Sequence, residues 1–228
     1  MTWGAARAMF ADRADAGRAL AAEVARHLTG VTGDGGRPLV LALPRGGVPV
    51  AARVADVIDG DLDIVIARKI GAPHHPEYGV GALAEDGPPV FNTEALQYLD
   101  LVEEDLAGAV AHERAEISRR LRRYRGERPA PQTAGRTVVL VDDGLATGVT
   151  ARAALRWLRT RQPQHVLLAV PVCSRAARDA MTTDADTVIC LRAPEPFTAV
   201  GTWYADFRQL TDTDVEQILE QFRHAHAR

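Results

Sequence analysis

Residues 138–150 have the sequence VVLVDDGLATGVT, which joins a strand, two adjacent acids and a short glycine-bounded loop. The first four residues are all apolar, which predicts a strand covered on both faces. Asp142 and Asp143 then fall at its carboxyl end. Gly144 and Gly148 bracket a tight turn that opens a helix. A buried strand that runs through a turn into a helix favours an α/β fold with a parallel sheet.

The rest of the chain continues this alternation. Apolar strands are predicted at residues 39–43, 62–67, 137–143, 165–172 and 187–191. Helices are predicted at residues 5–28, 48–58, 149–161, 174–181 and from 212 onward, with a charged helix or helical pair at 93–125. The segment 68–81 contains so many Gly, Pro and His residues that we expect no regular element there. Ligands bind beyond the carboxyl ends of such strands, which selects the loops 44–47, 68–79 and 142–150.

The loop after the two acids has the chemistry of a phosphate site. Small residues let backbone N–H groups approach a phosphate, and the N-terminus of the following helix adds a favourable dipole. Thr147 and Thr150 add hydroxyl donors, while the two carboxylates can accept hydrogen bonds from sugar hydroxyls. A sugar 5-phosphate with free 2- and 3-hydroxyls fits this pairing. The alternative is a purely structural turn, in which an Asp caps the helix.

The composition excludes several classes of protein. The 228 residues are 46% hydrophobic and carry a net charge of −3, so a folded core is expected and duplex nucleic acid is not an expected partner. No apolar stretch approaches the ~20 residues that cross a bilayer, and no signal peptide is recognisable, so we expect a cytoplasmic protein without membrane contact. Cys173 and Cys190 lie in apolar runs and are expected to be buried thiols rather than a disulfide. Lys69 is the only lysine among the 27 basic residues. Either the chemistry at this position requires a lysine, or this one lysine was retained by chance.

The string DDGLATGVT resembles the phosphoribosyl-pyrophosphate (PRPP) signature of the type I phosphoribosyltransferases. The stretches FADRADAGRALA, LALPRGGVPVA, ARKIGAPHHPE and WYADF also resemble predicted members of that family with no assigned base, nearly from end to end. The resemblance implies a mainly parallel sheet flanked by helices, with a small hood. It assigns PRPP binding to Asp142, Asp143, Gly144, Leu145, Ala146, Thr147, Gly148, Val149 and Thr150.

The resemblance also implies where pyrophosphate would lie. After the first strand, Arg45, Gly46 and Gly47 match the loop that binds pyrophosphate, and Arg68 and Lys69 match a basic pair on the same group. Residues 70–79 resemble the mobile loop that closes the active site. Arg208 in the tail is a further candidate for contact with pyrophosphate. Without the signature, the Arg-Gly-Gly stretch alone would more often be a surface turn.

The acceptor is less well specified by the resemblance. Ala146 stands where oxopurine enzymes carry an Asp, and DDGLATGVT resembles the adenine-type signature instead. Glu77 begins a Glu-Tyr-Gly sequence that the adenine enzymes also carry in their mobile loop. Phe197 or Trp203 could stack on a base, with Asp206 as a polar partner. Equally, these aromatic residues could hold the hood on the core, and Glu77 could simply be solvated.

These observations predict one domain, with a core at about 37–192, a hood or flank from 1–36 and 193–228, and a helical insertion at about 93–125. The implied reaction transfers 5-phosphoribosyl from PRPP to a nitrogen acceptor, expected to be a nucleobase as in purine salvage, with release of pyrophosphate. Mg²⁺ is the implied cofactor, held by Asp142 and Asp143 mostly through water, and the implied assembly is a homodimer. The catalytic candidates are Lys69, Arg68, Glu77 and Asp143. The alternative function is a regulatory protein that senses PRPP without turnover.

Overall fold

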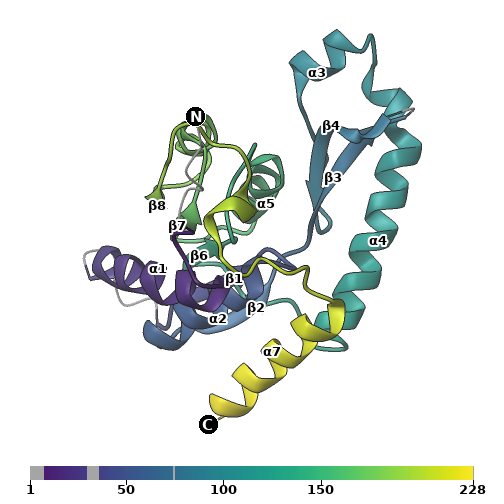
Figure 1. The fold of residues 1–228 in the computed structure, drawn as a ribbon. Coiled ribbons are helices and arrows are strands. Elements are labelled where there is room, and N and C mark those ends of the chain that lie inside the picture. The colour runs from purple at the N-terminus through teal and green to yellow at the C-terminus, as the bar shows by residue number, and fades with distance from the viewer. Residues whose placement is uncertain (1–7, 30–35, 74, 228) are drawn as a thin grey trace, which may run out of the picture.

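The centre of the protein is a parallel sheet of five strands, as the sequence predicts. The computed structural model describes residues 8–29, 36–73 and 75–227, so the first residues of the expected N-terminal helix lie outside the described residues. The strand order is β2-β1-β6-β7-β8, and all four neighbouring pairs are parallel (Figure 1). The strands are β1 Leu39–Ala42, β2 Asp61–Ile64, β6 Thr137–Val141, β7 His165–Val172 and β8 Thr187–Arg192.

Helices cover both faces of this sheet, because its strands are apolar on both sides. On one face, Val40 and Ala42 pack with α1 (Arg13–Leu28) and α2 (Gly47–Val57). On the other face, Leu39 and Leu41 pack with α5 (Val149–Arg159) and α6 (Arg175–Met181). The last helix, α7 (Asp212–Ala225), lies beside α2 (Figure 1). The chain therefore has the predicted α/β architecture.

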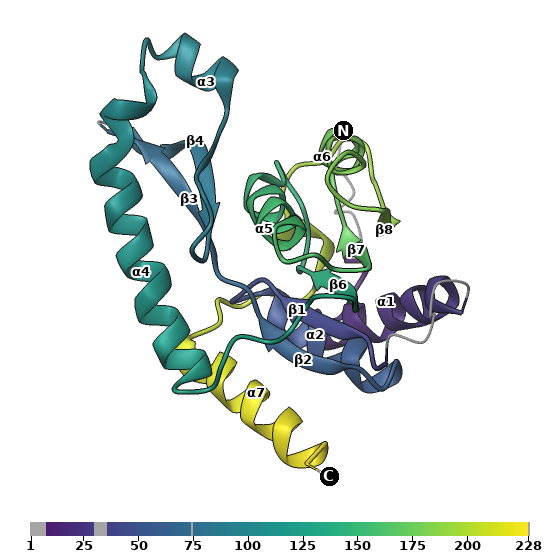
Figure 2. The same cartoon turned by 180° about the vertical axis from the view of Figure 1, so that it is seen from behind.

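An arm projects from the side of the sheet (Figure 2). It holds a second, antiparallel sheet in the order β3-β4-β5, together with the expected helical segment. The elements are β3 Ala67–Ala72, β4 His75–Ala84, β5 Val90–Phe91, α3 Thr93–Tyr98, the 3₁₀ turn η1 Glu103–Leu106 and α4 Ala107–Arg125. The long helix α4 runs along the hairpin of β3 and β4, and its Ile117 is buried against them.

The prediction that residues 68–81 form no regular element was wrong. Pro73 falls in the turn between β3 and β4, where it removes no ladder hydrogen bond. The register shifts on both sides of Gly71, which absorbs the irregularity as a bulge. At Gly81 a Cβ would lie 2.7 Å from the carbonyl oxygen of Val90, so the close approach of β5 requires a glycine. The residues that appeared to break the structure are those that permit this hairpin.

A buried group of charges fixes the base of the arm. Arg125 at the end of α4 donates to the carbonyl oxygen of Ile64 at 2.8 Å and to Glu85 at 3.2 Å, and it pairs with Asp63 at 3.4 Å. Burial raises the pKa of Glu85 although Arg125 opposes this rise. The ion pairs tie α4 to the ends of β2 and β4, so the arm is anchored in the core.

The residues before α1 lie against the segment around Tyr204. Helix α1 begins at Arg13 rather than at residue 5, because Asp12 caps it by accepting from the backbone N–H of Asp15. Before the cap, the backbone at Phe10 pairs with Tyr204, which follows the short turn η2 (Val200–Trp203).

Over residues 8–29, 36–73 and 75–227, no helix is both long and apolar enough to span a bilayer.

Candidate active site

The loop after β6 is anchored from behind and opens into α5. The N–H of Leu145 donates to the carbonyl oxygen of Val172, and the carbonyl oxygen of Leu145 accepts from the N–H of Ser174. Leu145 therefore anchors the loop, and its N–H is already engaged. Gly148 caps α5 with a left-handed backbone angle, φ +72°, that side chains disfavour. The exposed Thr147 and the half-buried Thr150 stand at the helix N-terminus, where a phosphate would bind.

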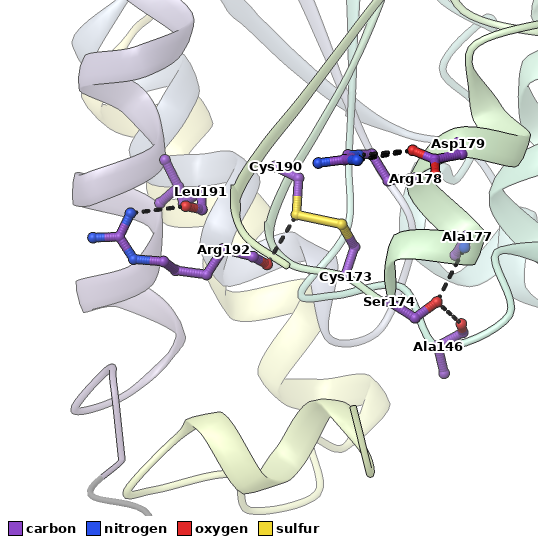
Figure 3. The surroundings of a disulfide bond; sticks show 9 residues. All are labelled: Ala146, Cys173, Ser174, Ala177, Arg178, Asp179, Cys190, Leu191 and Arg192. Atoms are coloured by element: carbon purple, nitrogen blue, oxygen red, sulfur yellow. Dashed lines mark hydrogen bonds and ion pairs between the residues drawn. A yellow bond between two sulfur atoms is a disulfide. The ribbon is translucent and has the colours of Figure 1, made fainter. Parts of the chain in front are cut away.

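A disulfide joins Cys173 and Cys190 directly behind this loop (Figure 3). The expectation of two free buried thiols was therefore wrong. Cys173 follows β7 and Cys190 lies in the neighbouring parallel strand β8, so the pairing of the strands brings their Cα atoms to 6.4 Å. Next to the bridge, Ser174 donates its hydroxyl hydrogen to the carbonyl oxygen of Ala146 at 2.7 Å. The bridge thus supports the segment on which the loop rests.

The two carboxylates lie between this loop and the Pro-Arg-Gly-Gly segment after β1. The Pro44–Arg45 peptide is cis. A Cβ at Gly46 would lie 1.9 Å from Oδ2 of Asp143, and one at Gly47 would lie 2.7 Å from the carbonyl oxygen of Val141. Only glycines allow this approach of the loop to the end of β6. The structure thus brings together the two segments that the sequence assigns to PRPP and pyrophosphate.

Both carboxyl groups are largely removed from water. Burial, followed by the charge of Asp143, raises the pKa of Asp142 well above its usual range. Burial also raises the pKa of Asp143, although its contact with Arg13 acts in the opposite direction. Asp142 Oδ1 accepts a hydrogen bond from the backbone N–H of Asp143. Carboxyl groups with strongly shifted pKa values are concentrated at functional sites, so this pair is a candidate functional centre.

Two residues at this centre were missed by sequence reasoning. Arg13 donates from Nε to Asp143 Oδ2 at 2.8 Å, and the Tyr204 hydroxyl donates to the carbonyl oxygen of Asp143 at 2.5 Å. Burial raises the pKa of Tyr204, so its hydroxyl stays protonated as a donor. Both residues lie in stretches that carry the family resemblance, FADRADAGRALA and WYADF. The resemblance marked the stretches, but it did not show what their side chains contact.

The predicted basic pair is divided by the alternation of β3. Arg68 donates to Glu113 of α4 at 2.7 Å, whereas Lys69 is exposed. Lys69 and Glu77 line two cavities of about 690 and 560 Å³ beside the loop after β6, residues 144–148. The larger cavity also contains Thr147, and the smaller contains Arg68 with residues from both loops, Pro44 and Thr150. Of the pair, Lys69 lines both cavities and Arg68 only the smaller one.

The other two arginine candidates face the tail. Arg45 lies 3.6 Å from Asp212 at the start of α7, and Arg208 lies 3.6 Å from Asp214 with 64% of its side chain exposed. Arg208 and Asp206 line a separate cavity of about 290 Å³, together with Arg13. In the structure each of these arginines therefore pairs with a carboxylate at the start of α7.

The predicted base-stacking residues are packed in a small cluster. Phe197 and Trp203 lie against the buried Phe10 and Tyr204 at the carboxyl end of β7. This packing holds the residues before α1 and the residues around η2 on the core. It is the structural role that the sequence left open beside base stacking. A role for Phe197, Trp203 and Asp206 toward an acceptor stays a prediction.

The donor set at the centre suits a hydrated Mg²⁺. Asp142 and Asp143 supply the carboxylate oxygens that this ion prefers, and Mg²⁺ commonly keeps several waters while it bridges substrate phosphates. Among the described residues, no group of three or more His, Cys, Asp or Glu side chains is gathered as a metal site. A Mg²⁺ here would therefore depend on the substrate and on water for most of its ligands.

The parallel sheet therefore carries, at one edge, a glycine-bounded loop that opens a helix and two adjacent carboxylates. The model of the phosphoribosyl transferase domain matches residues 11–202. The chain therefore belongs to the phosphoribosyltransferases, a family of pentosyltransferase-type enzymes. Its family assignment from the sequence is confirmed.

The names of two relatives agree with this assignment, and a solved structure is similar in sequence and fold. Two proteins of Mycobacterium tuberculosis, from strains CDC 1551 and H37Rv, both named "Putative phosphoribosyl transferase", are 40% identical over 216 residues. These matches cover 93% of this chain and 47% of theirs, so the chain spans about half the length of these curated relatives. The crystal structure of TT1426 from Thermus thermophilus superposes on this chain with a TM-score of 0.76 and a sequence identity of 43%. The match covers 93% of this chain and 98% of TT1426.

Proposed function

We propose that this protein transfers the 5-phosphoribosyl group of PRPP to a nitrogen acceptor, a nucleobase, and releases pyrophosphate. The observation that carries the proposal is the meeting of three features at one sheet edge. These are the loop that opens α5, the carboxylates of Asp142 and Asp143, and the glycines of residues 44–47. They provide, respectively, a phosphate cradle, acceptors for sugar hydroxyls and a surface of backbone for pyrophosphate.

The protein's own residues would act by position and charge. The backbone at residues 146–150 would hold the 5-phosphate at the N-terminus of α5. Asp142 and Asp143 would accept hydrogen bonds from the ribose hydroxyls and so fix C1. Lys69 would approach the pyrophosphate, whose negative charge grows as its bond to C1 breaks. These contacts orient the sugar and stabilise the leaving group, which are the main needs of a transition state with oxocarbenium character.

Mg²⁺ bound to the substrate would neutralise part of the pyrophosphate charge. We assign contact with the acceptor to Glu77, and its position in the lining of both cavities beside Lys69 supports this assignment. Phe197, Trp203 and Asp206 of the hood are further candidates for contact with the acceptor. The domain is proposed to comprise the core at 37–192 with flanks from both chain ends, and to work as a homodimer in purine metabolism.

Release of pyrophosphate from PRPP, measured with each common nucleobase in the presence of Mg²⁺, tests this proposal. A thermal-shift assay with Mg²⁺ and PRPP tests binding without an acceptor. A ligand at 100 times its Kd adds about 2.7 kcal/mol, which corresponds to a rise of about 5–11 °C in Tm for a protein of this size. The matched control is the double variant Asp142→Asn, Asp143→Asn, which should lose this rise.

The outcomes separate the enzyme from the regulatory alternative. Pyrophosphate release with one base supports the transferase and identifies its acceptor. Binding of PRPP without release for any base would favour a PRPP sensor. A wild-type protein whose Tm does not respond to PRPP would refute both.

A further inference from the structure

Arg13 lies outside the loops that resemble a PRPP site, yet it contacts the acid pair. Its Nε donates to Oδ2 of Asp143 at 2.8 Å across 130 positions of sequence. Only 11% of the Arg13 side chain and 14% of the Asp143 side chain are exposed. This is a well-shielded ion pair between the first residue of α1 and the end of β6.

The guanidinium is itself held in place by the C-terminal segment. Its Nη1 donates to the carbonyl oxygen of Arg208 at 3.0 Å, and its Cζ lies 3.9 Å from the ring centroid of Phe207. The segment is attached in turn to the residues before α1, since the N–H of Ala205 donates to the carbonyl oxygen of Phe10. A hydrogen bond, an aromatic face and a carboxylate thus fix the planar group in three directions.

The carboxyl group of Asp143 is confined from the other side as well. Its Oδ2 fills the space where any side chain at residue 46 would begin, 1.9 Å from a Cβ built on Gly46. Its backbone carbonyl accepts from Tyr204. The carboxylate therefore has one direction available to it, set by the loop on one side and Arg13 on the other.

Stability alone does not account for this arrangement. Helix α1 is already attached to α2 by buried side chains such as Leu20 and Val24, and by Gly17, where a Cβ would lie 2.8 Å from the carbonyl oxygen of Val50. A buried ion pair contributes little net stability, because removal of both charges from water offsets their attraction. Its clear effect is to fix the direction of a charged group.

We propose that Arg13 is a positioning residue, which holds Oδ2 of Asp143 so that this carboxylate meets the ribose hydroxyls or hydrated Mg²⁺ of PRPP in one orientation. The proposal rests on the proposed function, because it assumes that PRPP is the ligand of the acid pair. It makes the N-terminal segment a part of the active site.

The test compares Arg13→Ala, Arg13→Lys and the control Arg18→Ala by calorimetric titration with Mg²⁺ and PRPP. Arg18 lies on the same helix, but 60% of its side chain is exposed and it pairs with nearby Asp15. Arg13→Ala should bind PRPP at least about tenfold more weakly, equivalent to about 1.4 kcal/mol. Arg13→Lys should also bind more weakly, because one ammonium group cannot reproduce the planar, multidirectional contacts. Added methylguanidinium should restore part of the affinity of Arg13→Ala, which a loss of stability alone would not explain.

Circular dichroism establishes that each variant is folded at the temperature of the titration. A folded Arg13→Ala with the affinity of Arg18→Ala would overturn the proposal. If Arg13→Ala does not fold, Arg13→Lys decides, and wild-type affinity in that variant would overturn the requirement for a guanidinium. A wild-type protein that binds no PRPP would instead reject the proposed function, and the positioning role with it.

Discussion

Gly46→Ala offers a direct test of the close approach between the Arg-Gly-Gly loop and the acid pair. The new methyl group would lie 1.9 Å from Oδ2 and 2.5 Å from Cγ of Asp143, where about 3.4 Å or more is normal, so one partner must move by more than 1 Å. The backbone angles of Gly46, φ −63° and ψ −34°, are open to alanine, so the cost comes from contact and not from backbone strain.

The expected loss of stability follows from overpacking, which costs about 1–3 kcal/mol at a filled site. That corresponds to a fall of about 2–12 °C in Tm for a domain of this length. PRPP affinity should fall by about tenfold or more, because the methyl group displaces the carboxylate from its 2.8 Å contact with Arg13.

The assay is thermal unfolding with and without PRPP and Mg²⁺, and the matched control is Gly108→Ala. A Cβ at Gly108 meets no atom within 4 Å, and this residue lies within α4, so alanine should leave the Tm unchanged or raise it slightly. If Gly46→Ala retained the Tm and the PRPP response of Gly108→Ala, the two loops would not approach as closely as the structure indicates.

Three further outcomes are expected. Asp142→Asn should raise Tm at neutral pH while weakening PRPP binding. Burial raises the pKa of Asp142, so the carboxyl group contributes stability below its unfolded-state pKa and loses this contribution as pH rises through its folded-state pKa, at about 1.4 kcal/mol per pH unit. The gain in Tm from the neutral Asn should therefore vanish in acid. An equal Tm for both proteins at pH 7 would count against this burial. Lys69→Arg should keep PRPP binding while turnover falls about tenfold, because a planar guanidinium is a poor substitute for a compact ammonium at a point contact; wild-type turnover would show that this lysine is only solvated. Reduction of the Cys173–Cys190 bridge, whose cysteines are 17 residues apart, should lower Tm by about 6–12 °C, since a loop of such length is worth about 3 kcal/mol; a Tm indifferent to the reductant would contradict a bridge in solution.

The central sheet could be predicted because its signal is local. Runs such as residues 138–141 and 166–172 are apolar throughout, and their burial on both faces leaves no competing period. The phosphate loop could be predicted for the same reason, since two acids, two glycines and two threonines lie within nine consecutive residues. Such features need no knowledge of distant contacts.

The hairpin and the disulfide could not be predicted because they depend on pairing. Glycine and proline weaken strands on average, yet Gly71 and Gly81 lie where a bulge and a close neighbour require them. Cys173 and Cys190 resemble ordinary core residues in sequence, and only the adjacency of β7 and β8 brings them into bonding distance. In both cases the partner strand decides the role of the residue.

The predicted core, residues 37–192, does not contain all the residues that contact Asp143. Asp143 is given its direction by Arg13, 130 positions earlier, and by Tyr204, 61 positions later, and both lie outside residues 37–192. A segment of those residues contains all five strands, the phosphate loop and Lys69, so it carries every group that the signature names. It lacks the cation and the hydroxyl that fix the buried carboxylate, and an uncompensated charge at that position would be costly. The start of α1 and the segment after η2 therefore orient Asp143, although they lie outside the loops at residues 44–47 and 142–150.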